Sequence, residues 1–492
     1  MEIKNNEKGN FMKPYVNFIV PPYHKRKGSG TVFPLGIGYL ISSLSSHKID
    51  SEILDFTEKM DDIEEEITEL SIDREVKNFV ASLLNKESPL FWGIGPITTA
   101  SAVFLEWIIS SIHKYSDQPI ICGGPLPSIS GQRWLFFDYL KVDAIIMGDG
   151  EKAIVEAAKY LLDGKLLSEC PHIVTIGKPD YYNLLPDIND VPFPYRIQAK
   201  VSIRRRIVPS PTASMITMRG CPYQCPFCVS GNLRGMGRKK YSKRSIDNII
   251  TELKMLQSEG YRSVIFYDDC LFFGRNVNDQ IAEFCYAICE AELCLNWTME
   301  LRPDVFELLT EESFSALAVS GCREINIGFE SANFKTQKNF KKKFDIQNTA
   351  MQCQIGMKAG IAINGTFIVG GPHETVETIN NTISVASQLG LLFAHFTPLE
   401  VYPGTPLYTS MFKDDDRAWF YLLKNDSLKW NEIIYETKTL SSEKLISIAS
   451  EAYIQFYSNP DWPDRIRQFF SSENAEQVIK ESFEMIKNRY NI

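Results

Sequence analysis

Residues 219–228 of this 492-residue chain read RGCPYQCPFC. Within them, Cys221, Cys225 and Cys228 follow the spacing C-x3-C-x2-C. Thiolates this close together can ligate three irons of a [4Fe–4S] cube and leave the fourth iron open to a small molecule. The glycine and the two prolines favour a tight, extended loop, and Phe227 places a flat apolar surface beside the cluster.

A zinc knuckle, a disulfide loop and three buried thiols are the alternatives for these cysteines. Zinc needs a fourth ligand, and the nearest histidines, His172 and His373, are remote in the sequence. The strands and helices expected after the loop favour the cluster.

Length and composition indicate a globular protein of two or three domains. The chain is 44% hydrophobic and 23% charged, which is ordinary for that class. Its net charge of −9 argues against a nucleic-acid partner bound through a broad basic surface. Short basic runs at residues 204–206, 238–240 and 341–343 are interpreted as solvated loops.

We expect a cytoplasmic protein without a membrane span. The first ten residues are polar and charged, unlike a signal peptide, and no stretch approaches ~18 consecutive apolar residues. The 11 cysteines show no regular pairing, which suits a reducing compartment.

Residues 10–175 alternate between expected strands and helices. The strands are expected at 15–20, 50–56, 90–95, 119–125 and 142–151, and the helices at 34–46, 98–114 and 151–163. The acidic stretch 58–69 is interpreted as a solvated helix face. This alternation predicts an α/β domain with a doubly wound parallel sheet, whose ligands bind beyond the carboxyl ends of the strands.

Residues 213–408 contain a second series of β-α units. Strands are expected at 213–219, 263–269, 295–302, 324–331, 363–370 and 394–401, with helices near 243–259, 276–293, 310–319, 346–359 and 375–389. Functional groups of such parallel arrangements gather at the carboxyl ends of the strands. The proline-rich residues 176–212 are interpreted as a linker, and residues 409–492 as a mostly helical C-terminal region.

The cysteine spacing and the six units that follow it resemble the radical S-adenosylmethionine (SAM) superfamily. The resemblance implies a partial (β/α)6 TIM-type barrel, with SAM bound at the open iron and cleaved to a 5'-deoxyadenosyl radical. It also implies an external electron donor such as flavodoxin or ferredoxin. The SAM contacts that it implies are Phe227, Tyr267, Asp268, Asp269, Glu300, Arg302, Glu330, Ser331 and Gly370.

Several of these residues have a structural alternative. The two aspartates, 268 and 269, are also compatible with a helix N-cap or a surface turn. Glu300 and Arg302 lie on the same face of their expected strand, so a salt bridge between them is an equal contender. Glu374 and Thr375 are expected to begin the next helix.

The first domain resembles the Rossmann-like cobalamin-binding domain that precedes the barrel in one subgroup of this superfamily. The residues that the resemblance places at the cofactor are Pro34, Leu35, Gly36, Tyr39, Gly93, Gly95, Gly123, Gly124, Pro125, Gly148, Asp149, Gly150 and Glu151. The chain departs from other B12 proteins because it lacks an Asp-x-His-x-x-Gly motif; Phe-Thr-Glu-Lys follows Asp55. A domain that keeps the fold without the cofactor is the alternative.

Four further cysteines, Cys270, Cys285, Cys289 and Cys294, offer a possible second cluster. Cys285 and Cys289 fall on the apolar stripe of an amphipathic helix, so we expect buried thiols facing a core. No cysteine follows Cys353, and one cluster is therefore expected.

The subgroup resemblance implies a cobalamin-dependent radical SAM methyltransferase. Its reaction would use the 5'-deoxyadenosyl radical to take hydrogen from an unactivated carbon, and cobalamin to supply the methyl group. A small-molecule or natural-product substrate is expected. Cyclisation, ring contraction or another rearrangement is one alternative, and a non-enzymatic B12- or redox-responsive binding module is another.

Overall fold

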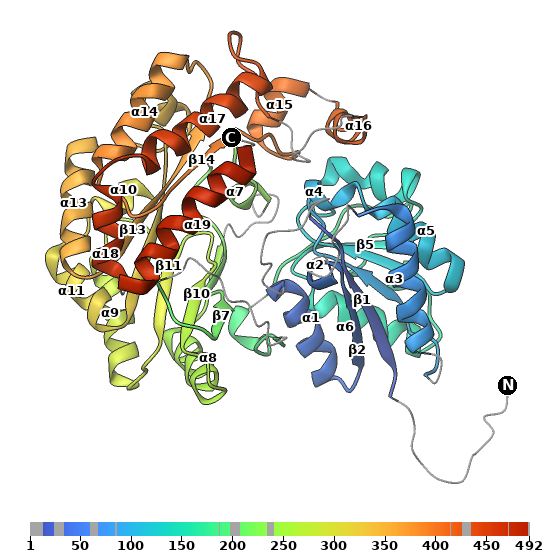
Figure 1. The fold of residues 1–492 in the computed structure, drawn as a ribbon. Coiled ribbons are helices and arrows are strands. Elements are labelled where there is room, and N and C mark those ends of the chain that lie inside the picture. The colour runs from blue at the N-terminus through green and yellow to red at the C-terminus, as the bar shows by residue number, and fades with distance from the viewer. Residues whose placement is uncertain are drawn as a thin grey trace. The chain divides into compact units, whose positions relative to one another are not determined.

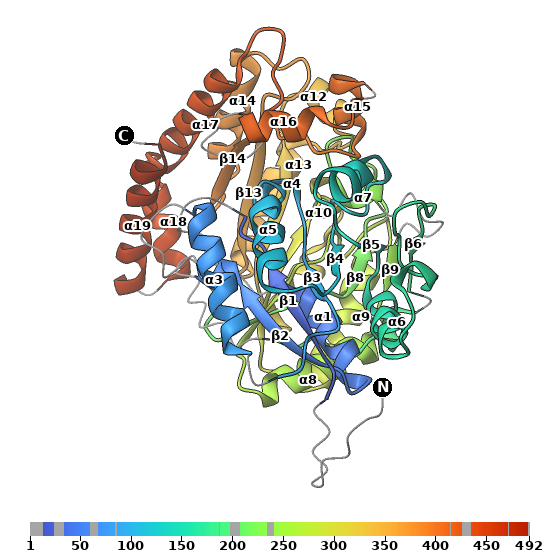
Figure 2. The same cartoon turned by 90° about the vertical axis from the view of Figure 1, so that its right-hand side faces the viewer.

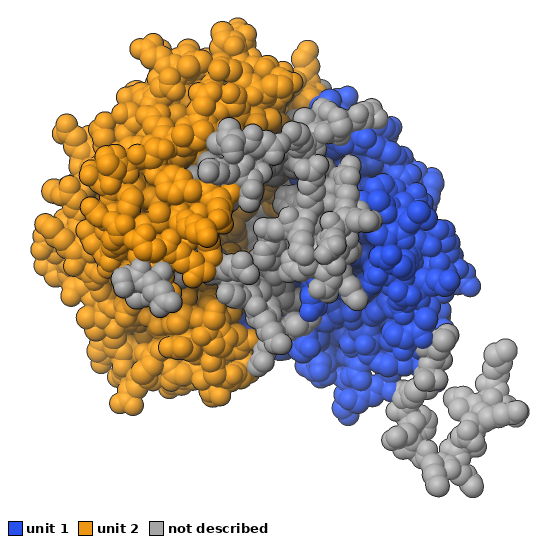
Figure 3. All heavy atoms as spheres, in the orientation of Figure 1, with its two compact units in different colours: residues 1–199, 415–431 blue, residues 200–414, 432–492 orange. Residues whose placement is uncertain are grey.

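The computed structural model describes residues 13–23, 34–59, 67–83, 86–185, 187–196, 207–233, 241–413, 415–425, 434–470 and 472–490. The chain divides into two compact units, coloured in Figure 3. Unit 1 comprises Met1–Ala199 with Asp415–Asn431, and unit 2 comprises Lys200–Asp414 with Glu432–Ile492. The chain thus returns to unit 1 once after entering unit 2.

Unit 1 is built on a parallel sheet of order β2-β1-β3-β4-β5-β6. Its strands are β1 (Tyr15–Val20), β2 (Asp50–Asp55), β3 (Trp92–Ile94), β4 (Ile120–Gly123), β5 (Ala144–Gly148) and β6 (Tyr182–Asn183). All six residues of β1 are buried, as expected for a central strand covered on both faces. The strand order reverses between β1 and β3, and ligands of doubly wound sheets bind at such a switch point.

Helices cover both faces of this sheet (Figure 1). They are α1 (Leu35–Ser46), α2 (Phe56–Lys59), α3 (Glu69–Ser82), α4 (Thr99–Ala102), α5 (Leu105–Tyr115) and α6 (Glu151–Leu162). Helix α1 lies against α6, and α3 lies against α5. The helix expected at 98–114 is two helices, and residues 60–66 of the acidic stretch lie outside the described residues.

A helix from the C-terminal part of the chain completes unit 1. Helix α16 (Ala418–Asn425) buries Trp419, whose indole Nε1 donates a 2.7 Å hydrogen bond to Oε1 of buried Gln132. Lys424 forms a 2.8 Å salt bridge with Glu106. The C-terminal region, residues 409–492, is therefore divided between the two units.

Unit 2 contains six parallel strands of order β14-β13-β12-β11-β10-β7. They are β7 (Thr212–Met215), β10 (Ser263–Phe266), β11 (Asn296–Leu301), β12 (Cys322–Glu330), β13 (Ala362–Val369) and β14 (Ala394–Pro398). Strands that neighbour one another in chain order, joined by helices, confirm the partial (β/α)6 barrel. A short antiparallel pair, β8 (Met218–Gly220) with β9 (Tyr241–Lys243), follows β7.

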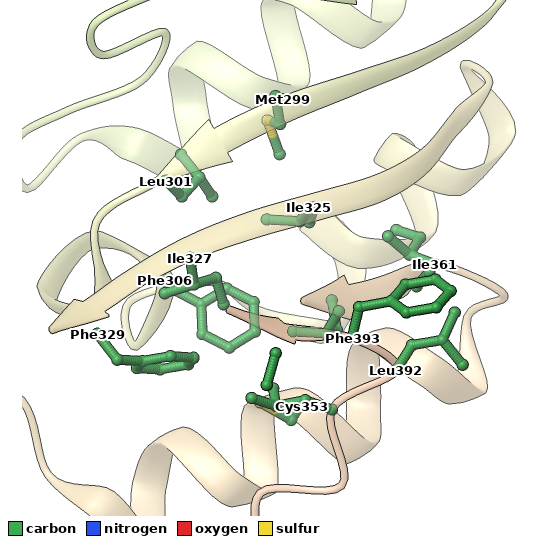
Figure 4. Close-up of a cluster of buried hydrophobic side chains, with 14 of the residues drawn as sticks. Met299, Leu301, Phe306, Ile325, Ile327, Phe329, Cys353, Ile361, Leu392 and Phe393 are labelled. Carbon is green, nitrogen blue, oxygen red and sulfur yellow. The ribbon is translucent and has the colours of Figure 1, made fainter. Parts of the chain in front are cut away.

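The helices between these strands match the expected segments and add short ones. They are α7 (Ser230–Leu233), α8 (Ile246–Ser258), α9 (Val277–Glu290), α10 (Pro303–Phe306), α11 (Glu311–Val319), α12 (Phe334–Asn339), α13 (Ile346–Lys358) and α14 (Val376–Gln388). Figure 4 shows how Ile325 and Ile327 of β12 meet apolar side chains from neighbouring elements. Phe367 also stacks between Phe329 and Phe396, with ring centroids 5.5 and 5.2 Å away.

The C-terminal region is mostly helical, as expected, with α15 (Pro406–Phe412), α17 (Ser442–Tyr457), α18 (Trp462–Phe469) and α19 (Ser472–Tyr490) in unit 2. Helix α17 packs on the edge strand β14, side by side in Figures 1 and 2. The Tyr457 hydroxyl donates to the carbonyl of Ala394 at 3.2 Å, and the Trp462 indole donates to that of Leu392 at 2.7 Å. In the described ranges, no helix combines the length and apolar character needed to cross a bilayer.

Gly370, directly after β13, provides a test of this packing. It has φ +91°, and a Cβ there would lie 2.7 Å from the side chain of Leu445 on α17. Gly360 has a similar φ of +83°, but nothing lies within 4 Å of its Cβ position. We predict that G360A costs about 1–2 kcal/mol of stability through backbone strain, and that G370A costs about 1–3 kcal/mol more through the clash.

Urea unfolding of the two variants side by side checks this prediction. Equal shifts of the unfolding midpoint would show that α17 does not press on Gly370.

Candidate cluster and cofactor sites

The cysteine loop begins where β8 ends, shortly after β7, the first strand of the barrel. Gly220 closes β8 with φ +79°, a backbone conformation that suits glycine. Cys225 is buried, Cys221 and Cys228 are half-buried, and none of the three forms a disulfide. The disulfide alternative is therefore wrong for this structure, and two of the thiols are open to a ligand.

The residues around the loop fix its backbone. The Asn232 amide donates to the carbonyl of Cys228 at 2.6 Å and to that of Cys225 at 3.3 Å. The N–H of Leu407 donates to the carbonyl of Pro226 at 3.0 Å, and this bond ties the loop to α15. Phe227 meets Phe340 edge-on, with ring centroids 4.7 Å apart, so one side of the loop is apolar as expected.

The donor set fits an iron–sulfur cube better than a zinc ion. Within the described ranges, no three His, Cys, Asp or Glu side chains converge on a position that one metal ion would fill. A cube distributes its thiolates over three different irons, so its ligands need not converge on a single point. Three thiols on one short loop, two of them half-buried, meet that requirement.

Cys270 is buried as expected, but it also lies beside this loop, a contact that was not expected from the sequence. Its thiol interacts with Cys221, and that hydrogen bond lowers the pKa of Cys221 to about 7. Cys285 is buried as expected, but Cys289 and Cys294 are exposed, so their assignment to a core was wrong. The position of Cys270, directly after the second strand and its two aspartates, was the signal available for this role.

The carboxylate of Asp268 anchors the backbone that enters the cluster loop. Its Oδ1 accepts hydrogen bonds from the N–H groups of Thr217 and Met218, each 2.7 Å long. Its Oδ2 is buried and accepts no hydrogen bond in the described part of the chain. Burial raises the pKa of this carboxyl to about 7. Tyr267 and Asp269 are exposed, so the three adjacent residues have different environments.

Arg302 and Glu300 do not share an environment either. Glu300 is exposed, whereas Arg302 is 8% exposed and forms its salt bridge with Asp304 at 2.9 Å. Nη1 of Arg302 lies 3.1 Å from Sγ of Cys225. Of the strand-end residues expected to contact SAM, Arg302 thus directly contacts a candidate ligand of the cluster, Cys225.

Glu330 forms a buried pair with Lys342, at 2.5 Å, and φ at Glu330 is +63°. Lys342 also donates to the carbonyl of Gly328 at 2.8 Å. The expectation of a solvated loop at 341–343 was therefore wrong for its central lysine; residues 204–206 and 238–240 lie outside the described residues. The pair stabilises the irregular end of β12, where the register shifts between Gly328 and Glu330.

Glu374 was expected only to begin the next helix, but it also links two strand ends. Its buried carboxylate accepts hydrogen bonds from the N–H groups of Gly370 and Gly371, at 3.0 and 2.9 Å, and from the Ser331 hydroxyl at 2.7 Å. It thus joins the ends of β12 and β13, while Thr375 caps α14 as expected. The spacing Gly-Gly-x-x-Glu was the signal for this role.

The glycines of unit 1 that the resemblance places at the cofactor divide into two classes. A Cβ at Gly36 or Gly123 would meet nothing within 4 Å. By contrast, Gly148 has φ +83°, and its Cβ would lie 2.2 Å from the carbonyl of Asn183. A Cβ would also meet protein atoms at four further glycines of this second class: Gly93, Gly95, Gly124 and Gly150. Open backbone at Gly36 and Gly123 suits the close approach of a large cofactor, whereas internal packing accounts for the second class.

The remaining residues assigned to cobalamin differ in exposure. Pro125 is exposed, Pro34 and Leu35 are half-buried, and Tyr39 is buried. Asp149 is buried and accepts a 3.0 Å hydrogen bond from the N–H of Leu185. Glu151 begins α6 and is buried. Where a cobalt-binding motif would carry histidine, the hydroxyl and N–H of Thr57 donate to Asp55 at 2.6 and 2.8 Å.

The pKa of Cys221 yields a prediction for the protein without a cluster. Because the thiolate is the nucleophile, alkylation of Cys221 by iodoacetamide should rise with pH around a midpoint of about 7, as its pKa prescribes. C270A removes the hydrogen bond and should move that midpoint up toward the ordinary value of 9.0. Peptide mass spectrometry separates Cys221 from the other cysteines.

C353A is the matched control, because Cys353 is buried and lies on α13. It should leave the Cys221 midpoint unchanged. A midpoint that C270A does not move would contradict the contact between the two thiols.

Comparison with known proteins agrees with this geometry. The radical SAM superfamily matches residues 215–386. An uncharacterized methyltransferase, PH0819 of Pyrococcus horikoshii, is 25% identical over 472 residues, which cover 90% of this chain and 92% of that protein. TsrM from Kitasatospora setae, solved with cobalamin and a [4Fe–4S] cluster bound, has a TM-score of 0.68 at 16% identity, covering 96% of this chain and 99% of that one.

A second solved structure has the same fold. The cobalamin-dependent SAM radical enzyme OxsB, solved with aqua-cobalamin and SAM bound, has a TM-score of 0.62 at 14% identity. The match covers 97% of this chain and 71% of that one. Residues 215–386 therefore match the radical SAM superfamily, and the fold of the chain is that of solved cobalamin-dependent radical SAM enzymes.

Proposed function

We propose that this enzyme is a methyltransferase that uses a [4Fe–4S] cluster, SAM and cobalamin to methylate an unactivated carbon of a small molecule or natural-product intermediate. The observation that carries the proposal is the loop of three free thiols at the carboxyl end of the barrel strands. Likeness along nearly the whole chain to a structure with cobalamin and a cluster bound supports the assignment of unit 1.

The chain's own residues would hold and orient the cofactors. Cys221, Cys225 and Cys228 would ligate three irons and leave one iron for SAM. When bound, the cofactors would pass on the electron and supply the hydrogen-abstracting radical and the methyl group. Glu374 accepts hydrogen bonds from the N–H groups of Gly370 and Gly371, and would thereby hold the carboxyl end of β13 in a fixed geometry.

Among the residues assigned to SAM, the geometry favours some roles over others. Phe227 and the half-buried thiols are on accessible sides of the loop, whereas Oδ1 of Asp268 and the hydroxyl of Ser331 form internal hydrogen bonds. We therefore assign Asp268 to support of the backbone that enters the cluster loop, and Ser331 to support of the loop after β13 through Glu374. The electron would come from an external donor such as flavodoxin or ferredoxin.

In unit 1, the open backbone at Gly36, in the first turn of α1, and at Gly123, the last residue of β4, would receive cobalamin. No residue of the segment after Asp55 offers an imidazole to cobalt. Binding would then rest on burial of the corrin ring and on hydrogen bonds from strand-end backbone.

Anaerobic purification and turnover test the proposal. The protein should contain about four irons and four sulfides per chain, as one cube requires, together with a corrinoid. With reductant, SAM carrying a deuterated methyl group and a metabolite extract of the source cells, it should form 5'-deoxyadenosine and a product that carries the labelled methyl group. Mass spectrometry detects both.

C225S should abolish 5'-deoxyadenosine formation, whereas C289S, which changes an exposed cysteine, should leave it unchanged. A new product without the label would indicate that the enzyme catalyses a rearrangement instead of a methylation. The absence of both 5'-deoxyadenosine and product would indicate a binding module instead.

A further inference from the structure

Arg302 is held in one orientation beside the cluster loop. It follows β11 directly and forms the N-cap position of α10. Its Nε and Nη2 donate to the two carboxylate oxygens of Asp304 at 2.9 and 3.3 Å, and Nη2 also donates to the carbonyl of Lys341 at 2.9 Å. The guanidinium lies over the ring of Tyr223, 3.8 Å from its centroid. Contacts from three sides thus fix the plane of the group.

In this orientation one donor points at sulfur. Nη1 lies 3.1 Å from Sγ of Cys225, the most buried thiol of the loop. A hydrogen bond from a cation to a thiolate is charge-assisted, and it is stronger where water is excluded. Arg302 is 8% exposed, so solvent screens this contact weakly.

We propose that Arg302 is a positioning residue that hydrogen-bonds the Cys225 thiolate and thereby raises the reduction potential of the cluster. The inference rests on the proposed function, because it needs the cluster. One electron from the external donor adds one negative charge to the cluster, and no proton transfer is required. A cation and a hydrogen bond at a ligating sulfur stabilise that added charge, so reduction becomes easier.

This role differs from the SAM contact that the sequence suggested for Arg302. A guanidinium has five N–H donors, and a bidentate grip on a carboxylate uses two of them. Four donors of Arg302 are already engaged by Asp304, Lys341 and Cys225. One donor therefore remains, which is too few for a bidentate hold on the carboxylate of SAM.

The test is redox titration of the loaded protein without SAM, followed by electron paramagnetic resonance of the reduced cluster. R302Q removes the cation, and its midpoint potential should be more negative than that of the wild type by at least a tenfold change in the reduction equilibrium, about 59 mV for one electron. R302K keeps the charge but loses the rigid fork, and its potential should fall between the two.

R323Q is the matched control. Arg323 of β12 donates to the carbonyls of Ala318 and Cys322, away from the loop cysteines, and its loss should leave the potential unchanged. If R302Q takes up no cluster, R302K decides: its potential should be more negative than that of the wild type.

Two results would overturn the inference. One is an unchanged potential in R302Q and R302K. The other is an unchanged potential together with weakened SAM binding, measured by equilibrium dialysis. That result would show that Arg302 binds the carboxylate of SAM. A wild-type protein that takes up no cluster would contradict the proposed function itself, and this inference with it.

Discussion

Buried carboxylates hold the loops at the carboxyl ends of the barrel strands, and the candidate site depends on them. Asp268 accepts two backbone N–H groups that enter the cluster loop, and Glu374 accepts two at the end of β13. A buried N–H left without an acceptor costs about 1–3 kcal/mol, so these loops have little freedom to move. Rigid loops are what a radical reaction needs, since atoms misplaced by a fraction of an ångström react poorly or with the wrong partner.

The regular elements could be predicted from the sequence because they depend on local pattern. Apolar runs such as Tyr15–Val20 and Ile325–Phe329 predict buried strands, and the C-x3-C-x2-C spacing predicts the ligands by itself. Side-chain partners far apart in the chain could not be predicted in this way. Arg302 was expected to pair with Glu300 or with the carboxylate of SAM, but it contacts a sulfur that lies 77 residues away in the sequence. Lys342 was expected in solvent because a run of lysines is usually exposed, yet Glu330 offsets the cost of burying it.

The glycines of unit 1 do not all have the role that their motifs predict. Motif glycines were all assigned to the cofactor, but most of them avoid a clash within the protein itself, and Gly36 and Gly123 remain the open positions. The same lesson applies to Gly370, whose missing side chain makes room for Leu445 of α17. Geometry at each residue, rather than the motif as a whole, separates a glycine required by the fold from one available to a ligand. The two units thus share one arrangement: each has a parallel sheet, and candidate cofactor contacts follow its strands.

The central claim is that three thiolates hold one four-iron cube with an unprotected corner. Mössbauer spectroscopy of protein loaded with 57Fe tests it most directly, because the method distinguishes irons by their ligands. The account predicts one cube in which a single iron changes its signal when SAM is added, while the other three keep theirs. A single iron in a tetrathiolate site, or a cube that does not respond to SAM at any of its irons, would contradict it.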